Sequence, residues 1–146
     1  MDRMGRALLA CALAWLLPGG GHLYLGKRGK AGIFFAVVLV TFLTGLAMDG
    51  RVYLAGSDQP LSYLAAFANV GLGPLDLVGR TFSYDRVIYR MPDPGNRALH
   101  GEILEATRRR ILSPTHEYGT TFLLTASLMN ILLILDAFDI SVGRKP

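Results

Sequence analysis

Four long apolar segments, separated by charged stretches, dominate the pattern along this chain. They run from residues 7 to 25, 31 to 48, 61 to 78 and 118 to 135. A helix rises about 1.5 Å per residue, so each segment is just long enough to cross a hydrocarbon core of about 30 Å. The apolar residues come in blocks rather than along one helical face. This pattern predicts an all-α fold, a membrane-embedded bundle of three or four transmembrane helices in a single domain over residues 1–146.

Two of these segments carry helix breakers. Pro18 and the glycines after it predict a kink or break in the segment 7–25. Gly71, Gly73 and Pro74 interrupt the segment 61–78, which can form a spanning helix, a re-entrant segment or a helix lying against the others. We favour the spanning helix.

The stretch from Arg80 to Glu117 is the one extended polar region. Asp93 followed by Pro94 predicts the start of a helix, because aspartate caps and proline fits the first helical position. Apolar residues from Leu99 to Ile111 can share a broad face, and Arg108, Arg109 and Arg110 suit the helix end. Either an interfacial amphipathic helix or a solvated surface helix fits this pattern, and we favour the interfacial one.

Composition supports a membrane setting. Hydrophobic residues make up 51% of the chain, charged residues only 18%, and mean hydropathy is +0.37, more apolar surface than a soluble domain of 146 residues can hide. The net charge of +4 then favours anionic lipid headgroups over nucleic acid, for which no motif is present. Cys11 stands alone, which excludes a disulfide framework and a thiolate metal cluster.

Charge also predicts an orientation. If four segments cross, the first and third loops share one side and hold ten of the 15 Lys and Arg residues, including Lys27, Arg28 and Lys30. The positive-inside rule then places these loops in the cytoplasm and both termini outside. We therefore expect a multi-pass protein of the cytoplasmic (inner) membrane.

Asp76, Asp136 and Asp139 are the sharpest candidates for chemistry, because a carboxylate inside hydrocarbon needs a partner or a pathway. Each lies at the end of its segment, so we favour anchoring, for instance by pairing with Arg80 or Arg144, over a proton or ion relay. His22, close to a membrane interface, can hydrogen-bond a carbonyl or ligate a metal or the magnesium of a pigment. The spacing of the three histidines predicts no local metal site.

Small and amide residues predict helix contacts instead of catalysis. Gly32 and Ala36 stand four apart, the spacing that lets helices approach closely, and Asn69 and Asn130 are mid-segment amides suited to interhelical hydrogen bonds. Gly19-Gly20-Gly21 lacks the Lys-Ser/Thr of a phosphate-binding loop, and no Gly-x-Ser-x-Gly occurs. We predict no enzyme and no metal.

Residues 18–26 read Pro-Gly-Gly-Gly-His-Leu-Tyr-Leu-Gly, followed by a basic turn and the Gly32-led apolar segment. This arrangement resembles the two-transmembrane domain family, whose signature would assign Pro18, Gly19, Gly20, Gly21, His22, Tyr24 and Gly26 to its first hairpin. The C-terminal segment from Tyr118, with Asp136 and Asp139, resembles a bacterial membrane family known only as a domain of unknown function. Neither resemblance implies a catalytic residue.

The first functional hypothesis is a non-enzymatic accessory or structural subunit of a larger membrane complex, with other integral membrane subunits and anionic lipid as partners. If that complex is a photosynthetic or respiratory, energy-transducing assembly, the helices can also contact pigment or quinone; bound lipid is expected and no cofactor is predicted. One alternative is a small transporter or ion-conducting oligomer built on Asp76, Asn130 and Asp136. Another is a lipid-binding membrane scaffold acting through Arg108–Arg110.

Overall fold

The computed structural model describes residues 3–56 and 60–145, and this part of the chain folds into seven helices. They are α1 (Arg3–Leu16), α2 (Gly20–Tyr24), α3 (Arg28–Ala47), α4 (Pro60–Val70), α5 (Pro74–Tyr84), α6 (Arg97–Ile111) and α7 (His116–Ser141). Within these residues, β pairing is limited to one isolated bridge between Ala55 and Arg90. The predicted all-α class is confirmed.

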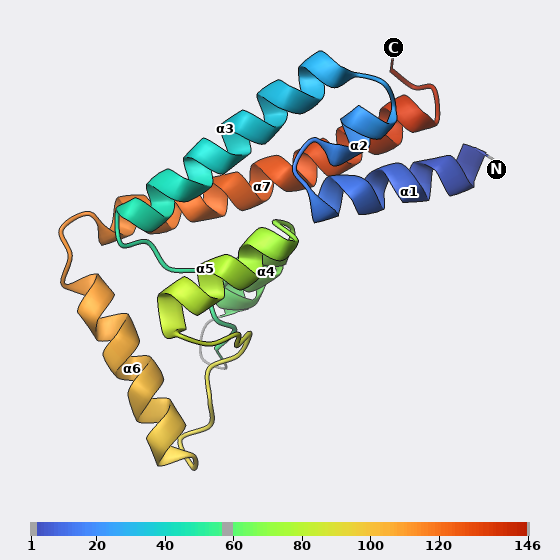
Figure 1. The fold of residues 1–146 in the computed structure, drawn as a ribbon. Helices are drawn as coiled ribbons and strands as arrows, with labels where there is room; N and C mark the ends of the chain where they lie inside the picture. Colours follow the sequence, from blue (N-terminus) through green and yellow to red (C-terminus); the bar gives the residue numbers. More distant parts are fainter. Residues whose placement is uncertain (1–2, 57–59, 146) are drawn as a thin grey trace.

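Helix α7 is the axis of the fold, and α3, α1 and α4 all pack on it (Figure 1). Helix α3 lies along α7, and the start of α1 lies at the same end of the molecule as the end of α7 (Figure 1). The main core gathers side chains from α3, α5, α6 and α7, from the loop after α3 and from the turn between α4 and α5. Its buried members are Val38, Phe42, Val52, Leu72, Tyr84, Ile103, Leu123, Ala126 and Leu133.

Only α3 and α7 are long and apolar enough to cross a membrane, among the described residues. The predicted segments 31–48 and 118–135 fall within or against these helices, and α7 extends further at both ends. In the most apolar window of α3 only 22% of the residues are buried, and in that of α7 only 33%. The core helix of a soluble protein would be mostly buried, so the exposure of both helices supports a membrane setting.

The prediction of three or four spanning helices is wrong, because the segments 7–25 and 61–78 are each broken in two. The first ends at Leu16 and resumes as the short α2, with Gly19 in the left-handed region at φ +79°. The second ends at Val70 and resumes at Pro74, which occupies the first turn of α5. Helices α4 and α5 have 11 residues each, about 16 Å, so neither crosses a bilayer alone.

Gly73 explains the second break. Its backbone sits at φ +62° and ψ −132°, a conformation that L side chains rarely adopt, and a Cβ there would collide with the carbonyl oxygen of Trp15. The chain therefore turns where α1 ends against it, and α4 and α5 form a hairpin whose tip touches the tip of the α1–α2 hairpin (Figure 1).

This hairpin also removes the basis of the predicted orientation. Neither α4 nor α5 crosses. The basic turn of Lys27, Arg28 and Lys30 therefore lies at the start of α3, and the arginine-rich α6 lies near the opposite end of that helix (Figure 1). Seven Lys and Arg residues then belong to the end with the termini and eight to the other, in place of ten against five. Charge no longer favours one orientation.

Helix α5 extends into the predicted polar region, since Arg80 to Tyr84 belong to this helix and the loop begins only after it. The helix start predicted at Asp93 is also wrong. Asp93 accepts the backbone N–H of Asn96 in a turn, and α6 begins at Arg97 with Asn96 Oδ1 accepting the N–H of Leu99. The turn from Asp93 to Asn96 delays the helix, and asparagine is an equally good cap. On α6, Ile103 is buried, whereas Leu104 and Ile111 are about half exposed.

Candidate functional site

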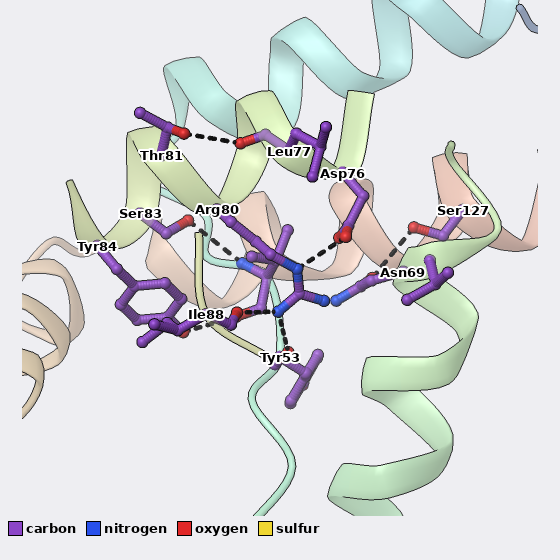
Figure 2. A network of polar contacts seen from close by, with 12 residues as sticks. Tyr53, Asn69, Asp76, Leu77, Arg80, Thr81, Ser83, Tyr84, Ile88 and Ser127 are labelled. Atoms are coloured by element: carbon purple, nitrogen blue, oxygen red, sulfur yellow. Dashed lines mark hydrogen bonds and ion pairs between the residues drawn. The ribbon is translucent and has the colours of Figure 1, made fainter. Parts of the chain in front are cut away.

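Arg80 is the centre of a buried polar cluster on the inner face of the α4–α5 hairpin (Figure 2). Its side chain is fully buried, and its Nε donates to Asp76 Oδ2 at 2.7 Å, one helical turn earlier. Its Nη1 donates to the carbonyl oxygens of Ile88 at 2.6 Å and Tyr53 at 3.4 Å. The guanidinium also lies 4.0 Å from the centre of the Tyr89 ring.

These contacts make Arg80 a cross-link between three segments. The guanidinium presents five donors in a rigid fork, so one side chain holds α5, the loop after α3 and the segment after α5 together. Asp76 supplies the compensating charge, since a buried guanidinium without a partner would be strongly destabilising. The arrangement anchors the hairpin electrostatically.

Asn69 and Ser127 extend the cluster from α4 to α7. Ser127 Oγ lies 2.8 Å from the carbonyl oxygen of Leu123 and 3.1 Å from the side-chain amide of Asn69. The hydroxyl of Ser127 donates to Asn69 Oδ1 and to the Leu123 carbonyl oxygen, and it thereby joins α4 to α7. The guanidinium of Arg80 points toward the amide of Asn69 in Figure 2.

The cluster leaves two buried donors without a hydrogen-bond partner among the described residues, Arg80 Nη2 and Asn69 Nδ2. The contacts form two short chains, one from Asn69 through Ser127 to Leu123 and one from Asp76 through Arg80 to Ile88 and Tyr53. Buried polar groups that are paired in this way favour one arrangement of the core over its alternatives.

The end of α5 clamps the loop that follows α3. Tyr84 Oη donates to the carbonyl oxygen of Val52 at 2.6 Å, and Ser83 Oγ accepts the backbone N–H of Val52 at 3.4 Å (Figure 2). Val52 itself is fully buried. Both polar groups of this loop residue are thus satisfied inside the protein, as burial requires.

Asn130 lies where the two hairpin tips meet α7. Its Nδ2 donates to the carbonyl oxygens of Gly71 at 2.7 Å and Ala14 at 3.4 Å. Gly71 directly follows α4, and Ala14 lies in the last turn of α1. Trp15 Nε1 donates to the carbonyl oxygen of Val70 at 2.8 Å across the same junction. The last carbonyls of a helix have no partner within that helix, so the amide and the indole satisfy part of what both breaks expose.

His22, Asp136 and Lys145 form a second polar group near the end of α7. His22 Nε2 lies 2.9 Å from Asp136 Oδ2, and its buried ring meets Phe34 edge-on at 4.9 Å. Lys145 Nζ donates to Asp136 Oδ1 at 2.6 Å, and this hydrogen bond raises the pKa of the exposed Lys145 amine. Asp139 pairs with Arg144 at 3.6 Å. All three candidate aspartates therefore face cationic or histidine partners.

The glycine run lies at a close approach of three helices. Gly21 is buried, and a Cβ there would meet the carbonyl oxygen of Ala10 and the Cβ atoms of Ala137 at 2.9 Å and Ala14 at 3.0 Å. Pro18 and Gly19 form the turn before α2, Gly20 begins α2, and Gly26 follows it at φ +79°. Tyr24 is exposed.

The other predicted contact residues lie on the surface. Gly32 and Ala36 face outward from α3, and Lys27 is half-buried while Arg28 and Lys30 are exposed at the start of that helix. Arg108 and Arg109 are exposed, but Arg110 is half-buried and donates to the carbonyl oxygens of Gly50 and Phe82. Arg110 thereby ties α6 to the rest of the protein.

Sequence reasoning missed several anchors. His116 Nδ1 donates to the carbonyl oxygen of Asp49 at 3.0 Å, and Thr115 Oγ1 donates to that of Met48 at 3.2 Å. Ser127, Ser83 and Tyr84 were also not singled out. Apart from the Leu123 contact of Ser127, each partner lies 31 to 67 residues away along the chain, so no local spacing marks these contacts.

The described residues hold no group of three or more His, Cys, Asp or Glu side chains that would suit a metal ion. Searches of curated proteins and of solved structures found no match. The model of a family of unknown function, DUF6677, matches residues 9–146. The match covers nearly the whole chain, including both helix breaks and all three aspartates, and the protein therefore belongs to this family.

Proposed function

We propose that this chain is a non-enzymatic subunit of a larger membrane complex, multi-pass in the cytoplasmic (inner) membrane, with α3 and α7 as its spans. The buried polar groups support a structural role, since each bonds a side chain or a backbone carbonyl of the same chain: Arg80 bonds Asp76, Asn69 bonds Ser127, and Asn130 bonds the Gly71 carbonyl oxygen. A complex then needs a surface that this chain leaves open.

The outer face of α3 is that surface, and it carries the proposal. The side of α3 that faces α7 contains Ala31, Val38, Phe42 and Gly45, all buried, and a Cβ on Gly45 would meet Leu123 at 2.8 Å. The opposite side carries exposed residues at helical spacing: Gly29, Gly32, Ala36, Val40 and Leu43.

Gly32 distinguishes the two sides. A Cβ added at Gly32 meets no atom of the described residues within 4 Å, so no contact among them requires a glycine there. A glycine costs a helix about 1 kcal/mol relative to alanine, and in membranes small residues four apart allow two helices to approach closely. A partner helix seated on Gly32 and Ala36 accounts for both small residues.

The test is the size of the assembly in native membranes solubilised with mild detergent. A tagged wild-type chain should migrate well above its own 15.9 kDa and contain other polypeptides identified by mass spectrometry. Gly32→Leu should reduce the assembled fraction about tenfold, because overpacking a helix contact costs roughly 1–3 kcal/mol. Thr125→Leu, an added side chain at an exposed position of α7, is the matched control and should assemble normally.

Two results would overturn the proposal. If the chain is a solitary monomer in mild detergent, the proposed complex does not exist. If Gly32→Leu and Thr125→Leu reduce the assembled fraction equally, the docking face is not on α3. An assembly made of this chain alone would favour the ion-conducting oligomer.

A further inference from the structure

Two cavities adjoin, because Tyr53 and Ser62 line both of them. The first, about 350 Å³, has a mixed lining that includes Arg51, Arg90, Asp93, His100 and Thr107. The second, about 330 Å³, is mainly apolar and is lined chiefly by residues of α4 and α7. We call the first the polar cavity, because all the charged residues in the two linings belong to it.

The polar cavity is suited to an anion. Its lining includes two guanidinium groups and one carboxylate, which leaves a positive balance. His100 Nδ1 donates to the carbonyl oxygen of Pro92 at 2.8 Å, which orients the ring. Arg51 Nε is buried and has no hydrogen-bond partner among the described residues, although its guanidinium also interacts with the Tyr84 hydroxyl. A buried donor of this kind is costly unless a ligand or water accepts from it.

The apolar cavity is suited to a hydrocarbon chain. Its walls include Leu61, Leu64, Ala65, Leu124 and Leu128. Leu124 and Leu128 lie 8 and 12 residues after the start of α7 at His116, roughly 12 and 18 Å along the helix axis. The backbone N–H of Arg51 donates to Thr120 Oγ1 at 3.2 Å, so Arg51 lies beside the first turns of α7, about one turn before Leu124. The polar cavity is thus nearer the start of α7, and the apolar cavity extends from there along the apolar part of the helix.

This order matches a phospholipid in a bilayer, whose phosphate sits above its acyl chains. We propose that the two cavities form one binding site for an anionic phospholipid, with the phosphate on Arg51 and Arg90 and one acyl chain between α4 and α7. Guanidinium groups bind phosphate oxygens by charge-assisted hydrogen bonds, which are stronger than hydrogen bonds between neutral groups. The site differs from Arg108 and Arg109, whose side chains are exposed on α6 and do not line either cavity.

The test is lipid binding by the delipidated full chain in detergent, followed by native mass spectrometry. Phosphatidylglycerol should bind at least about tenfold more tightly than phosphatidylcholine of the same acyl composition. Arg90→Gln, at an exposed position, and the double variant Arg51→Gln/Arg90→Gln should each lower the affinity for phosphatidylglycerol about tenfold or more. Binding of phosphatidylcholine should stay unchanged.

Two further variants test whether the lipid binds in the cavities or responds only to the net charge of the protein. Arg108→Gln/Arg109→Gln removes the same charge away from the cavities and should bind phosphatidylglycerol like the wild type. Ala65→Phe fills the apolar cavity and should weaken the binding of both lipids. Equal affinity for the two lipids, or equal losses in the two double variants, would overturn the proposal. Full displacement of the lipid by inorganic phosphate would show a free-phosphate site and would also overturn it.

The inference does not depend on the proposed subunit role. A lipid can occupy these cavities whether or not a partner helix covers Gly32, and the variants used in the two experiments share no residue. The amount of lipid retained and the size of the assembly are therefore separate measurements.

Discussion

The two helical hairpins, α1–α2 and α4–α5, solve the same structural problem with different chemistry. Each replaces one apolar segment by two shorter helices that reverse at a Pro/Gly-containing turn, and each packs on α7. The first is held along α7 mainly by small side chains, Ala10, Ala14 and Ala137, which form a cluster of their own. The second is held by polar contacts, the Asn69–Ser127 hydrogen bond to α7 and the bonds of Arg80 to Asp76 and to two backbone carbonyls.

The difference shows what each interface tolerates. Contact between small side chains depends on side-chain volume. An added methyl group should therefore lower the stability of this interface more than a change of polarity does. The polar interface depends on complete pairing, because a buried charge left alone costs more than the pair contributes. The two hairpins should therefore respond to different substitutions.

The largest effect is expected at the polar hairpin. Asp76→Ala leaves the buried guanidinium of Arg80 without its carboxylate, so the free energy of unfolding should fall by about 3–5 kcal/mol. The measurement is a titration with a denaturing detergent in mixed micelles.

A double variant separates the loss of the pair from the loss of charge balance. In Asp76→Leu/Arg80→Met both charges are absent, and most of the stability should return, because well-packed apolar residues often replace a buried pair at little cost. If the double variant is no more stable than Asp76→Ala, the carbonyl contacts of Arg80 matter more than its charge pair.

Much of the architecture was predictable from the apolar pattern, and the comparison of the hairpins shows where that pattern fails. The segments 31–48 and 118–135 contain no internal breaker that the fold uses, and each is one helix. The segments 7–25 and 61–78 are equally apolar, yet composition does not distinguish one crossing helix from two shorter ones. The deciding feature is backbone conformation, with φ +79° at Gly19 and +62° at Gly73.

The polar sites were predictable as residues but not as networks. Asp76 and Arg80 are one helical turn apart, and their pairing follows from spacing within one helix. The bond between Asn69 and Ser127 joins residues 58 apart, and that between His22 and Asp136 joins residues 114 apart. Such contacts depend on how the hairpins sit against α7, which the order of residues along the chain does not reveal.

The hairpin packed by small residues should fail through volume. Gly21→Ala introduces a Cβ that collides with the carbonyl oxygen of Ala10 and lies 2.9 Å from the Cβ of Ala137, so α1 or α7 must shift. We expect a loss of about 1–3 kcal/mol in the same unfolding titration, although alanine is the better helix former. Gly101→Ala is the control, since its Cβ would meet nothing within 4 Å. A loss of equal size there would contradict the steric explanation.

The smallest effect is expected where the two hairpins touch. Trp15 Nε1 donates to the carbonyl oxygen of Val70 at 2.8 Å, and Trp15→Phe removes that donor while keeping an aromatic ring. The net loss should be about 0.5–1.5 kcal/mol, because one hydrogen bond is lost and the carbonyl at the end of α4 is left without this partner. Trp15 is 40% exposed and phenylalanine keeps an aromatic ring at this position, so the substitution should remove little packing. Combined with Asp76→Ala, the effect should be less than additive if the hairpins stabilise each other through this bond, and additive if each is anchored to α7 independently.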